Sequence, residues 1–136
     1  MVITREADYA VRLTVGLATR KQGSPVSART LAEENDVPYE LARTILGDLA
    51  EAGILESRRG RSGGFMLARP ADEILMSDVL GVVGESLQLN ICVDDPEACK
   101  RAEFCPINPV WSEAAEVLRR FFGDRTLAGL ADASLE

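Results

Sequence analysis

Histidine is absent from the chain, and no segment supplies the residues of a common catalytic site. The 136 residues include 0 histidines, so the side chain that most often transfers protons in enzymes near neutral pH is missing. The glycine-rich stretch carries no lysine in the arrangement that cradles a phosphate group. We therefore expect a protein that is not an enzyme and has no small-molecule substrate.

Long apolar runs and a secretory signal are also missing. Charged residues or glycines interrupt every apolar stretch before it reaches the roughly 18 residues that span a bilayer. The start, MVITREADYA, is charged from Arg5 onward and lacks the regions of a signal peptide. We expect a cytoplasmic protein without a membrane partner. Its length favours one compact domain, and its ordinary contents of 46% apolar and 5% aromatic residues favour an aliphatic, helix-rich interior.

Positive charge is scarce overall but concentrated in one segment. Lysine and arginine total 15 against 22 aspartates and glutamates, which gives a net charge of −7 and counts against nucleic acid as a partner of the whole surface. Residues 58–69, RRGRSGGFMLAR, nevertheless contain four arginines and no acid. A basic segment in an otherwise acidic protein is a candidate contact for DNA.

The first half of the chain has the pattern of a helix-turn-helix. Thr4 is a candidate N-cap for a helix over residues 5–21, and Ser27 for a shorter helix that ends in a turn at Asn35 and Asp36. A third helix follows Pro38 and stops at Gly53. The apolar residues predicted to face the core are Leu41, Ile45, Leu46 and Leu49. The candidate DNA-binding residues on the outer face are Tyr39, Glu40, Arg43 and Thr44.

A β-hairpin is predicted directly after the third helix. Residues 54–57 and 65–68 read as two short strands that flank a glycine-rich turn. A hairpin in this position is the wing of a winged helix, and arginines at its tip can reach DNA phosphates or a narrow minor groove. The candidate wing residues are Arg58, Arg59 and Arg61, with an ordinary solvated turn as the alternative.

Two further helices are predicted beyond the hairpin. Ser77 is a candidate cap for a helix over residues 77–84, and a strongly amphipathic helix runs from Pro109 to Gly123. The candidate dimer-interface residues on that helix are Trp111, Ala115, Leu118 and Phe122, with burial against the chain's own core as the alternative. Residues 125–136 are predicted to form a weak helical turn that frays. The predicted fold is therefore mainly α: a winged helix-turn-helix with a two-stranded hairpin and a long C-terminal dimerisation helix.

All the cysteines lie in one short, charged stretch, ICVDDPEACKRAEFCP. Cys92, Cys99 and Cys105 are separated by six and five residues, whereas structural zinc sites commonly space their cysteines two to four residues apart. Three thiolates in a proline-stiffened loop favour an iron–sulfur cluster over a single ion. Zinc binding, thiol–disulfide switching and simple packing stay open as alternatives.

Taken together, these motifs resemble the Rrf2 superfamily of winged-helix transcription regulators. The resemblance covers nearly the whole chain and is carried by DYAVRL, by VPYELARTILGDLAEAGIL followed by RRGRSGGFMLAR, and by three loop cysteines before a long helix. It implies a homodimer in which each third helix and wing bind one half-site of palindromic double-stranded DNA. It also implies an iron–sulfur cluster held by the cysteine loop. Arg59 matches the position at which the family has an arginine, and the resemblance implies that this side chain enters the minor groove.

The fourth ligand of such a cluster is open. Some members of the superfamily use a histidine after the third cysteine, where this chain has Ile107 and Asn108. Others take an aspartate from the first helix of the partner subunit, and Asp8 matches that position. An ion pair with Arg12 is the alternative role for Asp8. The other candidate ligands are Asp94, Asp95, Glu97, Glu103 and solvent. Ligation by cysteine and oxygen favours a 4Fe-4S over a 2Fe-2S cluster.

The resemblance and the residues together predict a DNA-binding transcriptional regulator, and more specifically a repressor that senses iron, nitric oxide or redox state. Residues 1–84 are predicted to form the DNA-binding domain, residues 85–108 the cluster-binding loop, and residues 109–136 the dimerisation helix with its tail. The alternative is a winged-helix module that binds a partner protein and carries a zinc-binding or thiol–disulfide loop.

Overall fold

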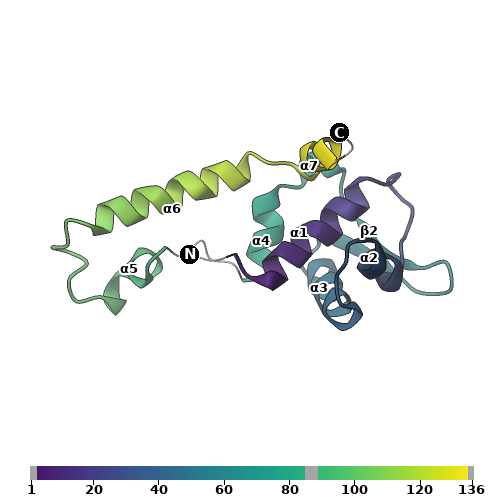
Figure 1. Cartoon of the computed structure of the whole chain (residues 1–136), viewed down its shortest axis with the longest axis horizontal. Coiled ribbons are helices and arrows are strands. Elements are labelled where there is room, and N and C mark those ends of the chain that lie inside the picture. The colour runs from purple at the N-terminus through teal and green to yellow at the C-terminus, as the bar shows by residue number, and fades with distance from the viewer. Residues whose placement is uncertain (1–2, 85–88, 135–136) are drawn as a thin grey trace.

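A computed structural model describes residues 3–84 and 89–134 and confirms the predicted fold class (Figure 1). The chain is mainly helical, with one antiparallel hairpin of two strands. The elements in chain order are α1 (Arg5–Ala18), α2 (Ala28–Glu34), α3 (Tyr39–Glu51), β1 (Leu55–Arg58), β2 (Gly64–Leu67), η1 (Ala71–Glu73), α4 (Met76–Val82), α5 (Ile91–Asp94), η2 (Pro96–Ala98), α6 (Asn108–Gly123) and α7 (Leu127–Ser134).

Side-chain caps start the first two helices, as predicted. The Thr4 hydroxyl accepts a hydrogen bond from the backbone N–H of Ala7 at 3.1 Å, and the Ser27 hydroxyl accepts one from the N–H of Thr30 at 3.1 Å. Such caps satisfy amide groups that have no partner within the helix. Helix α1 ends at Ala18 rather than at residue 21, because the backbone N–H of Arg20 donates to the carbonyl of Leu17, three residues back, at 3.1 Å.

The turn between α2 and α3 and the start of α3 also follow the sequence. Asp36 has a φ of 54°, a left-handed conformation that aspartate tolerates better than most side chains. Pro38 takes the N-cap position of α3, one residue before the helix begins. Beyond the helix, Gly53 has a φ of 83° and ends it.

One inward position on α3 was predicted wrongly. Leu41 is 48% exposed, and Ala42 is fully buried in its place. Leu41 and Ala42 are neighbours at the edge of the apolar face of α3. The buried part of that face consists of Ala42, Ile45, Leu46 and Leu49. A helix turns by about 100° per residue, so a shift of one residue at its first turn moves a large side chain from the core to the surface.

Helix α1 is the centre of the core. It packs against α2, α3, α4, α7 and β2, and its Leu13 is fully buried. Burying an aliphatic side chain of this size contributes about 1.5–3 kcal/mol to stability. The other large side chains that are almost completely buried are Leu31, Ile45, Leu46, Leu49, Ile74, Val79 and Leu127. The helix-turn-helix is therefore built on one face of α1.

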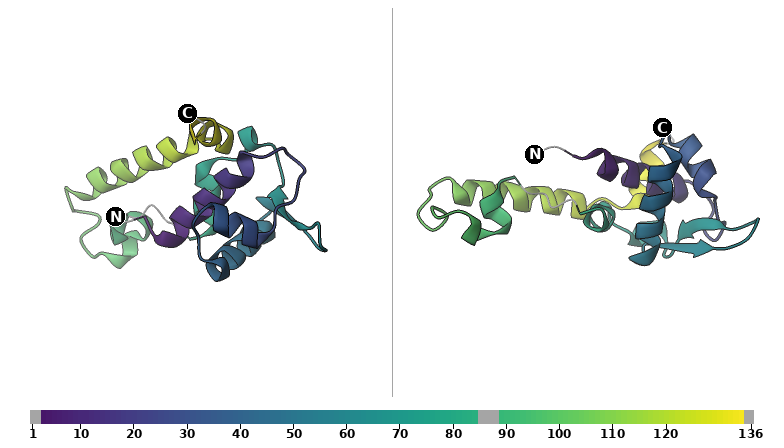
Figure 2. Two further views of the ribbon diagram at one scale, coloured as in Figure 1. Left: turned by 45° about the vertical axis from the view of Figure 1, so that its right-hand side comes forward. Right: turned by 90° about the horizontal axis from the view of Figure 1, so that it is seen from below.

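The hairpin is anchored at its base. Leu55 pairs with Leu67 and Arg58 with Gly64 across the two strands. Val26, which precedes α2, adds a short third pairing: its N–H donates to the carbonyl of Phe65 at 2.9 Å and its carbonyl accepts from the N–H of Phe65 at 2.8 Å. The strands are thus tied to the helical body, while the turn between them projects away from it (Figure 2).

Helix α4 does not begin where the sequence indicated. It runs over Met76–Val82 instead of residues 77–84, and Ser77 is not its cap. The carboxylate of Asp78 accepts a hydrogen bond from the backbone N–H of Leu75 at 2.9 Å and starts the helix. An acid three residues into a helix favours its N-terminus, so Asp78 takes over the predicted role of the serine.

The prediction that the tail frays is wrong. Residues 127–134 form α7, which packs on α1, with Leu127 fully buried and Ala131 only 3% exposed. Backbone hydrogen bonds fix its start: the N–H of Leu127 donates to the carbonyl of Ile74 at 2.9 Å, and that of Met76 to the carbonyl of Arg125 at 2.8 Å. The last helix therefore belongs to the same packed body as α1.

The predicted division of the chain into three parts, with boundaries after residues 84 and 108, stays a prediction.

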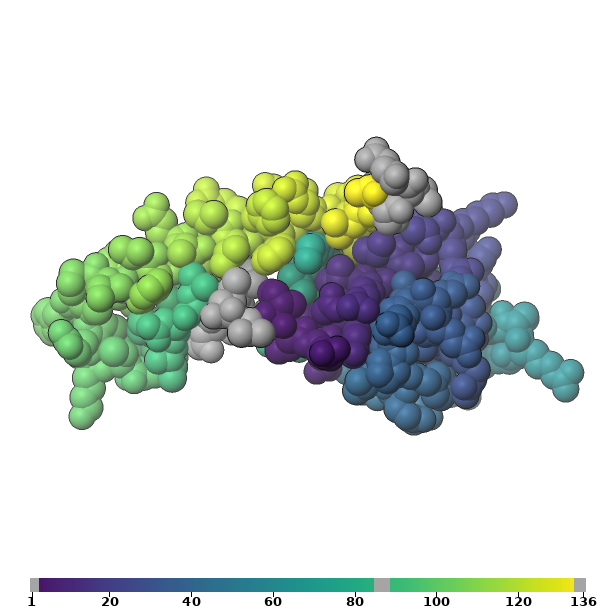
Figure 3. All heavy atoms as spheres, in the orientation of Figure 1, coloured from purple at the N-terminus to yellow at the C-terminus, as the bar shows by residue number. Residues whose placement is uncertain are grey.

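Helix α6 leaves this body. It extends to one end of the molecule, and α5 with the rest of the cysteine segment lies beside it there. The hairpin lies at the opposite end (Figures 1 and 3). No helix in residues 3–84 and 89–134 has the length and apolar content that a transmembrane segment needs.

Candidate nucleic-acid interface and cysteine segment

The outer face of α3 gathers the predicted base-contacting side chains. Glu40, Arg43 and Thr44 are exposed and Tyr39 is half-buried. The Arg43 guanidinium lies 3.3 Å from the Glu40 carboxylate, and the Thr44 hydroxyl donates to the Glu40 backbone carbonyl at 3.1 Å. Exposed ion pairs of this kind contribute little to stability. Both charged groups are therefore available to a ligand at the N-terminal half of the helix.

Leu41 belongs to this surface, although the sequence pattern placed it in the core. It is exposed between Glu40 and Arg43. A large apolar side chain on a helix that reads DNA has a physical use, because it can pack against the methyl group of thymine. The sequence pattern carries no signal for this position, because Leu41 and Ala42 are adjacent and both apolar.

The tip of the hairpin is basic and narrow. Arg58, Arg59 and Arg61 are all exposed, and Arg58 lies 3.7 Å from Glu56. Among the described residues, no carboxylate pairs with Arg59 or Arg61. Gly63 allows the close turn, because a Cβ atom there would lie 2.2 Å from the carbonyl oxygen of Arg58. Free guanidinium groups on a thin projection suit contacts with DNA phosphates or a narrow minor groove.

The cysteine segment lies along α6, away from the hairpin. Cys92 on α5 is 8% exposed, whereas Cys99 and Cys105 are half-buried; all three are free thiols. The Asn108 side chain donates to the Cys92 carbonyl at 3.5 Å, and Arg119 lies 3.5 Å from Asp94. These contacts attach the segment to the side of α6.

The donor set fits an iron–sulfur cluster in its chemistry. Three free thiols on one partly exposed segment would supply the thiolate ligands that iron–sulfur clusters prefer. The arrangement does not suit a site for a single metal ion. Within residues 3–84 and 89–134, no three or more cysteine, aspartate or glutamate side chains are arranged to hold one metal ion. Cys92, Cys99 and Cys105 are the residues that would hold a cluster.

Asp8 does not join the cysteines of its own chain. Its carboxylate lies 2.5 Å from the guanidinium of Arg12, one turn later on α1. Both side chains are about half-exposed, so the pair contributes little to stability and Asp8 stays accessible. The ion pair is the alternative role considered for this residue, and ligation of a partner's cluster stays a prediction.

The apolar face of α6 is largely uncovered, but it differs from the predicted set. Trp111 is 39% exposed, and Val110, Val117 and Phe121 are more than half exposed. Leu118 and Phe122 are half-buried, and Ala115 is fully buried within the monomer. Ala115 is thus covered by the chain's own residues, and the exposed apolar side chains of α6 are those of Val110, Trp111, Val117 and Phe121. The role of this helix in a dimer stays a prediction.

Comparison with known proteins agrees with this arrangement. The sequence profile of Rrf2, described as an iron-dependent transcriptional regulator, matches residues 3–133. The chain belongs to the Rrf2 family. Protein rrf2 of Nitratidesulfovibrio vulgaris is 29% identical, over 99% of this chain and 91% of that protein. An HTH-type transcriptional regulator of Mycobacterium tuberculosis is 32% identical, over 99% and 84% of the two chains.

Regulators named IscR are among the relatives. IscR of Xenorhabdus nematophila is 27% identical, over 96% of this chain and 79% of that protein. Among solved structures, IscR of T. potens has a TM-score of 0.80 at 23% identity, covering 98% of this chain and 88% of the other. CymR of B. subtilis has a TM-score of 0.79 at 22% identity, covering 98% of each chain. These structures share the winged-helix fold.

Membership of the Rrf2 family confirms three predictions. The protein is a transcriptional regulator, it is not an enzyme, and its winged helix is of the type with which Rrf2 regulators bind DNA. IscR and CymR are both among the structural neighbours, and membership of the Rrf2 family alone does not fix what this chain senses.

Proposed function

We propose that the chain is a homodimeric repressor that binds a palindromic DNA operator and senses iron, nitric oxide or redox state through an iron–sulfur cluster. The observation that carries the DNA-binding part is the basic hairpin tip of an otherwise acidic chain. Arg59 and Arg61 project from it without a described carboxylate partner. In this proposal Arg59 enters the minor groove while α3 lies in the major groove.

The proposed base contacts come from the first half of α3. Arg43 can donate to the O6 and N7 atoms of guanine, and Glu40 can accept from the N4 amine of cytosine. Leu41 can pack against a thymine methyl group. Tyr39 and Thr44 complete this surface. Contacts of these kinds discriminate between bases, whereas the contacts of Arg58 and Arg61 with phosphates hold the protein in place.

The proposed sensor is the cysteine segment. Cys92, Cys99 and Cys105 hold the cluster, and a 4Fe-4S type is favoured. Asp8 of the partner subunit supplies the fourth ligand. Bound there, a cluster supplies iron that exchanges with the cellular pool and sulfide-bridged iron that reacts with nitric oxide and oxidants. Asp8 lies on α1, which packs directly on α3. A change at Asp8 therefore acts on the helix that supports the DNA-reading helix.

The proposed dimer forms through α6. Trp111 and its exposed apolar neighbours Val110, Val117 and Phe121 make a stripe on one face of that helix. Leu118 and Phe122 border the stripe and complete the seam. A second copy that crosses this stripe places two DNA-binding bodies side by side, as a palindromic operator requires.

Selection from a pool of random duplex DNA tests the proposal. Protein purified without oxygen is expected to enrich a two-fold symmetric sequence with half-sites about 34–36 Å apart. The enriched duplex is then bound by protein with and without its cluster, and we expect different affinities for the two forms. Enrichment of no sequence would refute the DNA-binding proposal. Equal affinities on every enriched duplex would refute the coupling to the cluster.

A further inference from the structure

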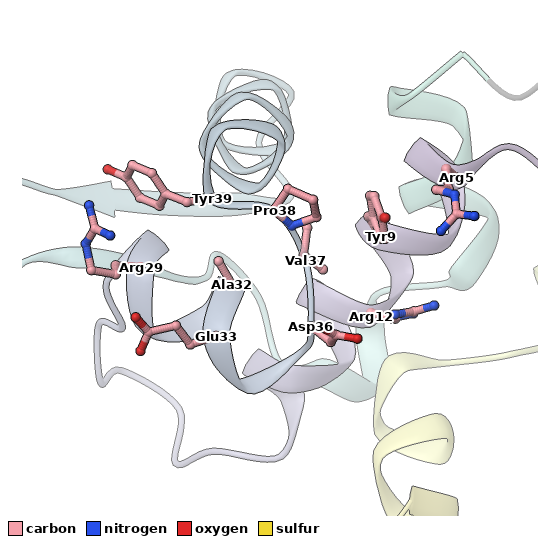
Figure 4. A pocket seen from close by; sticks show the side chains of 10 residues that line it. All are labelled: Arg5, Tyr9, Arg12, Arg29, Ala32, Glu33, Asp36, Val37, Pro38 and Tyr39. Carbon is pink, nitrogen blue, oxygen red and sulfur yellow. The ribbon is translucent and has the colours of Figure 1, made fainter.

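The surface beside the N-terminal end of α3 carries two arginines, Arg5 and Arg29, that lie outside the predicted DNA-binding residues. A groove of about 480 Å³ separates the start of α1 from α2 and the turn into α3. Figure 4 shows one arginine–tyrosine pair at each side of it: Arg29 with Tyr39, and Arg5 with Tyr9. Arg29 and Tyr39 come from two helices, α2 and α3, and meet only in the folded chain, whereas Arg5 and Tyr9 lie one turn apart on α1.

The first pair presents a free guanidinium. The Arg29 side chain lies over the ring of Tyr39, 4.2 Å from the ring centroid. Glu33 follows Arg29 by one helical turn, a spacing that favours an ion pair, yet within the described chain no carboxylate pairs with Arg29. Stacking uses the face of a guanidinium and leaves the N–H groups on its edge free, which is the geometry that phosphate oxygens accept.

The second pair is joined by a hydrogen bond and not by stacking, because the guanidinium over the Tyr9 ring is that of Arg12, 5.5 Å from the ring centroid. Arg5 is exposed at the first turn of α1, and a hydrogen bond to Tyr9 raises the pKa of Arg5 above its ordinary value. No carboxylate in residues 3–84 and 89–134 lies within ion-pair distance of it. Arg12, by contrast, is held by Asp8 at 2.5 Å. Two of the three arginines around the groove are therefore free to bind an external anion.

We propose that Arg29 and Arg5, each supported by a tyrosine, bind backbone phosphates of the DNA on either side of the point where α3 enters the major groove. This inference rests on the proposed DNA-binding function and adds a phosphate contact surface on α1 and α2. Glu33 and Asp36 also line the groove, and their negative charges repel phosphate from its interior. The backbone is consequently held at the two arginines and not inside the groove.

Salt dependence of binding distinguishes a phosphate contact from a base contact. Each phosphate contact contributes about 0.9 to the slope of log affinity against log salt concentration. Because a homodimer loses two such contacts, we expect Arg29→Ala and Arg5→Ala each to reduce that slope by about 1.8 and to weaken binding by roughly 10- to 100-fold near 0.1 M salt. The loss should be equal for the selected operator and for unrelated duplex DNA, because phosphates carry no sequence information.

Three variants serve as controls. Arg120→Ala removes the same charge from the polar side of α6, where Arg120 pairs with Glu116, and should leave the slope unchanged. Arg29→Lys keeps the charge and should retain the slope, which a purely structural role of Arg29 does not predict. Tyr39→Phe keeps the ring beneath Arg29 and should keep the slope, because the proposed phosphate contact depends on the ring and not on the hydroxyl.

The outcomes separate the two proposals. Unaltered protein that binds DNA, together with Arg29→Ala and Arg5→Ala variants that keep its affinity and slope, would overturn this inference alone. A loss confined to one base pair of the operator would also overturn it, because that is the signature of a base contact. Unaltered protein that binds no duplex at any salt concentration would overturn the proposed function itself.

Discussion

Replacing Gly64 with alanine tests how the wing is held. A Cβ atom at residue 64 would lie 2.2 Å from the carbonyl oxygen of Val26 and 2.8 Å from the backbone nitrogen of Ser27. Backbone atoms cannot rotate away, so the two hydrogen bonds between Val26 and Phe65 must lengthen or break. Each contributes about 0.5–1.5 kcal/mol. The φ of 142° at Gly64 adds strain of about 1–3 kcal/mol for alanine.

We therefore expect Gly64→Ala to lower the free energy of unfolding by about 2–6 kcal/mol. Denaturation by urea, followed by circular dichroism, measures this change. DNA affinity should fall as well, because the hairpin carries Arg59. Gly47→Ala is the matched control: the added Cβ meets nothing within 4 Å in α3, and alanine should raise stability by about 0.5–1 kcal/mol. A Gly64→Ala variant as stable as the unaltered protein would refute the pairing at Val26.

Three further predictions concern the wing, the last helix and the dimer. Arg59→Ala should weaken specific DNA binding by about 1–3 kcal/mol in a fluorescence anisotropy titration; unchanged affinity would count against the minor-groove role. Leu127→Ala should lower the free energy of unfolding by about 2–5 kcal/mol, whereas exposed Asp132→Ala should change it by less than about 0.5 kcal/mol. Equal effects would mean that α7 is not docked on α1. Val117→Ser should weaken the proposed dimer in sedimentation experiments, and an unaltered dimer would remove α6 from the interface.

Local chemistry explains why much of the fold could be predicted. Thr4 and Ser27 cap their helices through hydrogen bonds to residues three positions away, so a short window of sequence contains both partners. The same is true of the turn at Asp36 and of the glycine-rich hairpin. These elements, together with the basic tip, were sufficient to indicate a winged helix.

Features that depend on distant partners could not be predicted. The docking of α7 requires Ile74 to offer its carbonyl to Leu127, and the third pairing at the hairpin requires Val26 to meet Phe65. Leu41 and Ala42 are both apolar, so the pattern alone does not decide which of them faces the core.

In the candidate site, too, the features set by local sequence could be predicted and those set by distant partners could not. The exposed residues of α3 and the arginines of the wing follow from helix period and turn chemistry. The stacking of Arg29 on Tyr39 joins two helices and appears only in the folded chain. The buried position of Ala115 likewise follows from how α6 packs against its own subunit, and it moves the open apolar stripe to Trp111 and its exposed neighbours.

The content of iron and acid-labile sulfide in protein purified without oxygen tests the central claim most directly. The proposal predicts a brown protein with iron and sulfide in similar amounts, and a Cys99→Ser variant that holds much less of both. Colourless protein that stays poor in iron after reconstitution, or that contains zinc in place of iron, would contradict it.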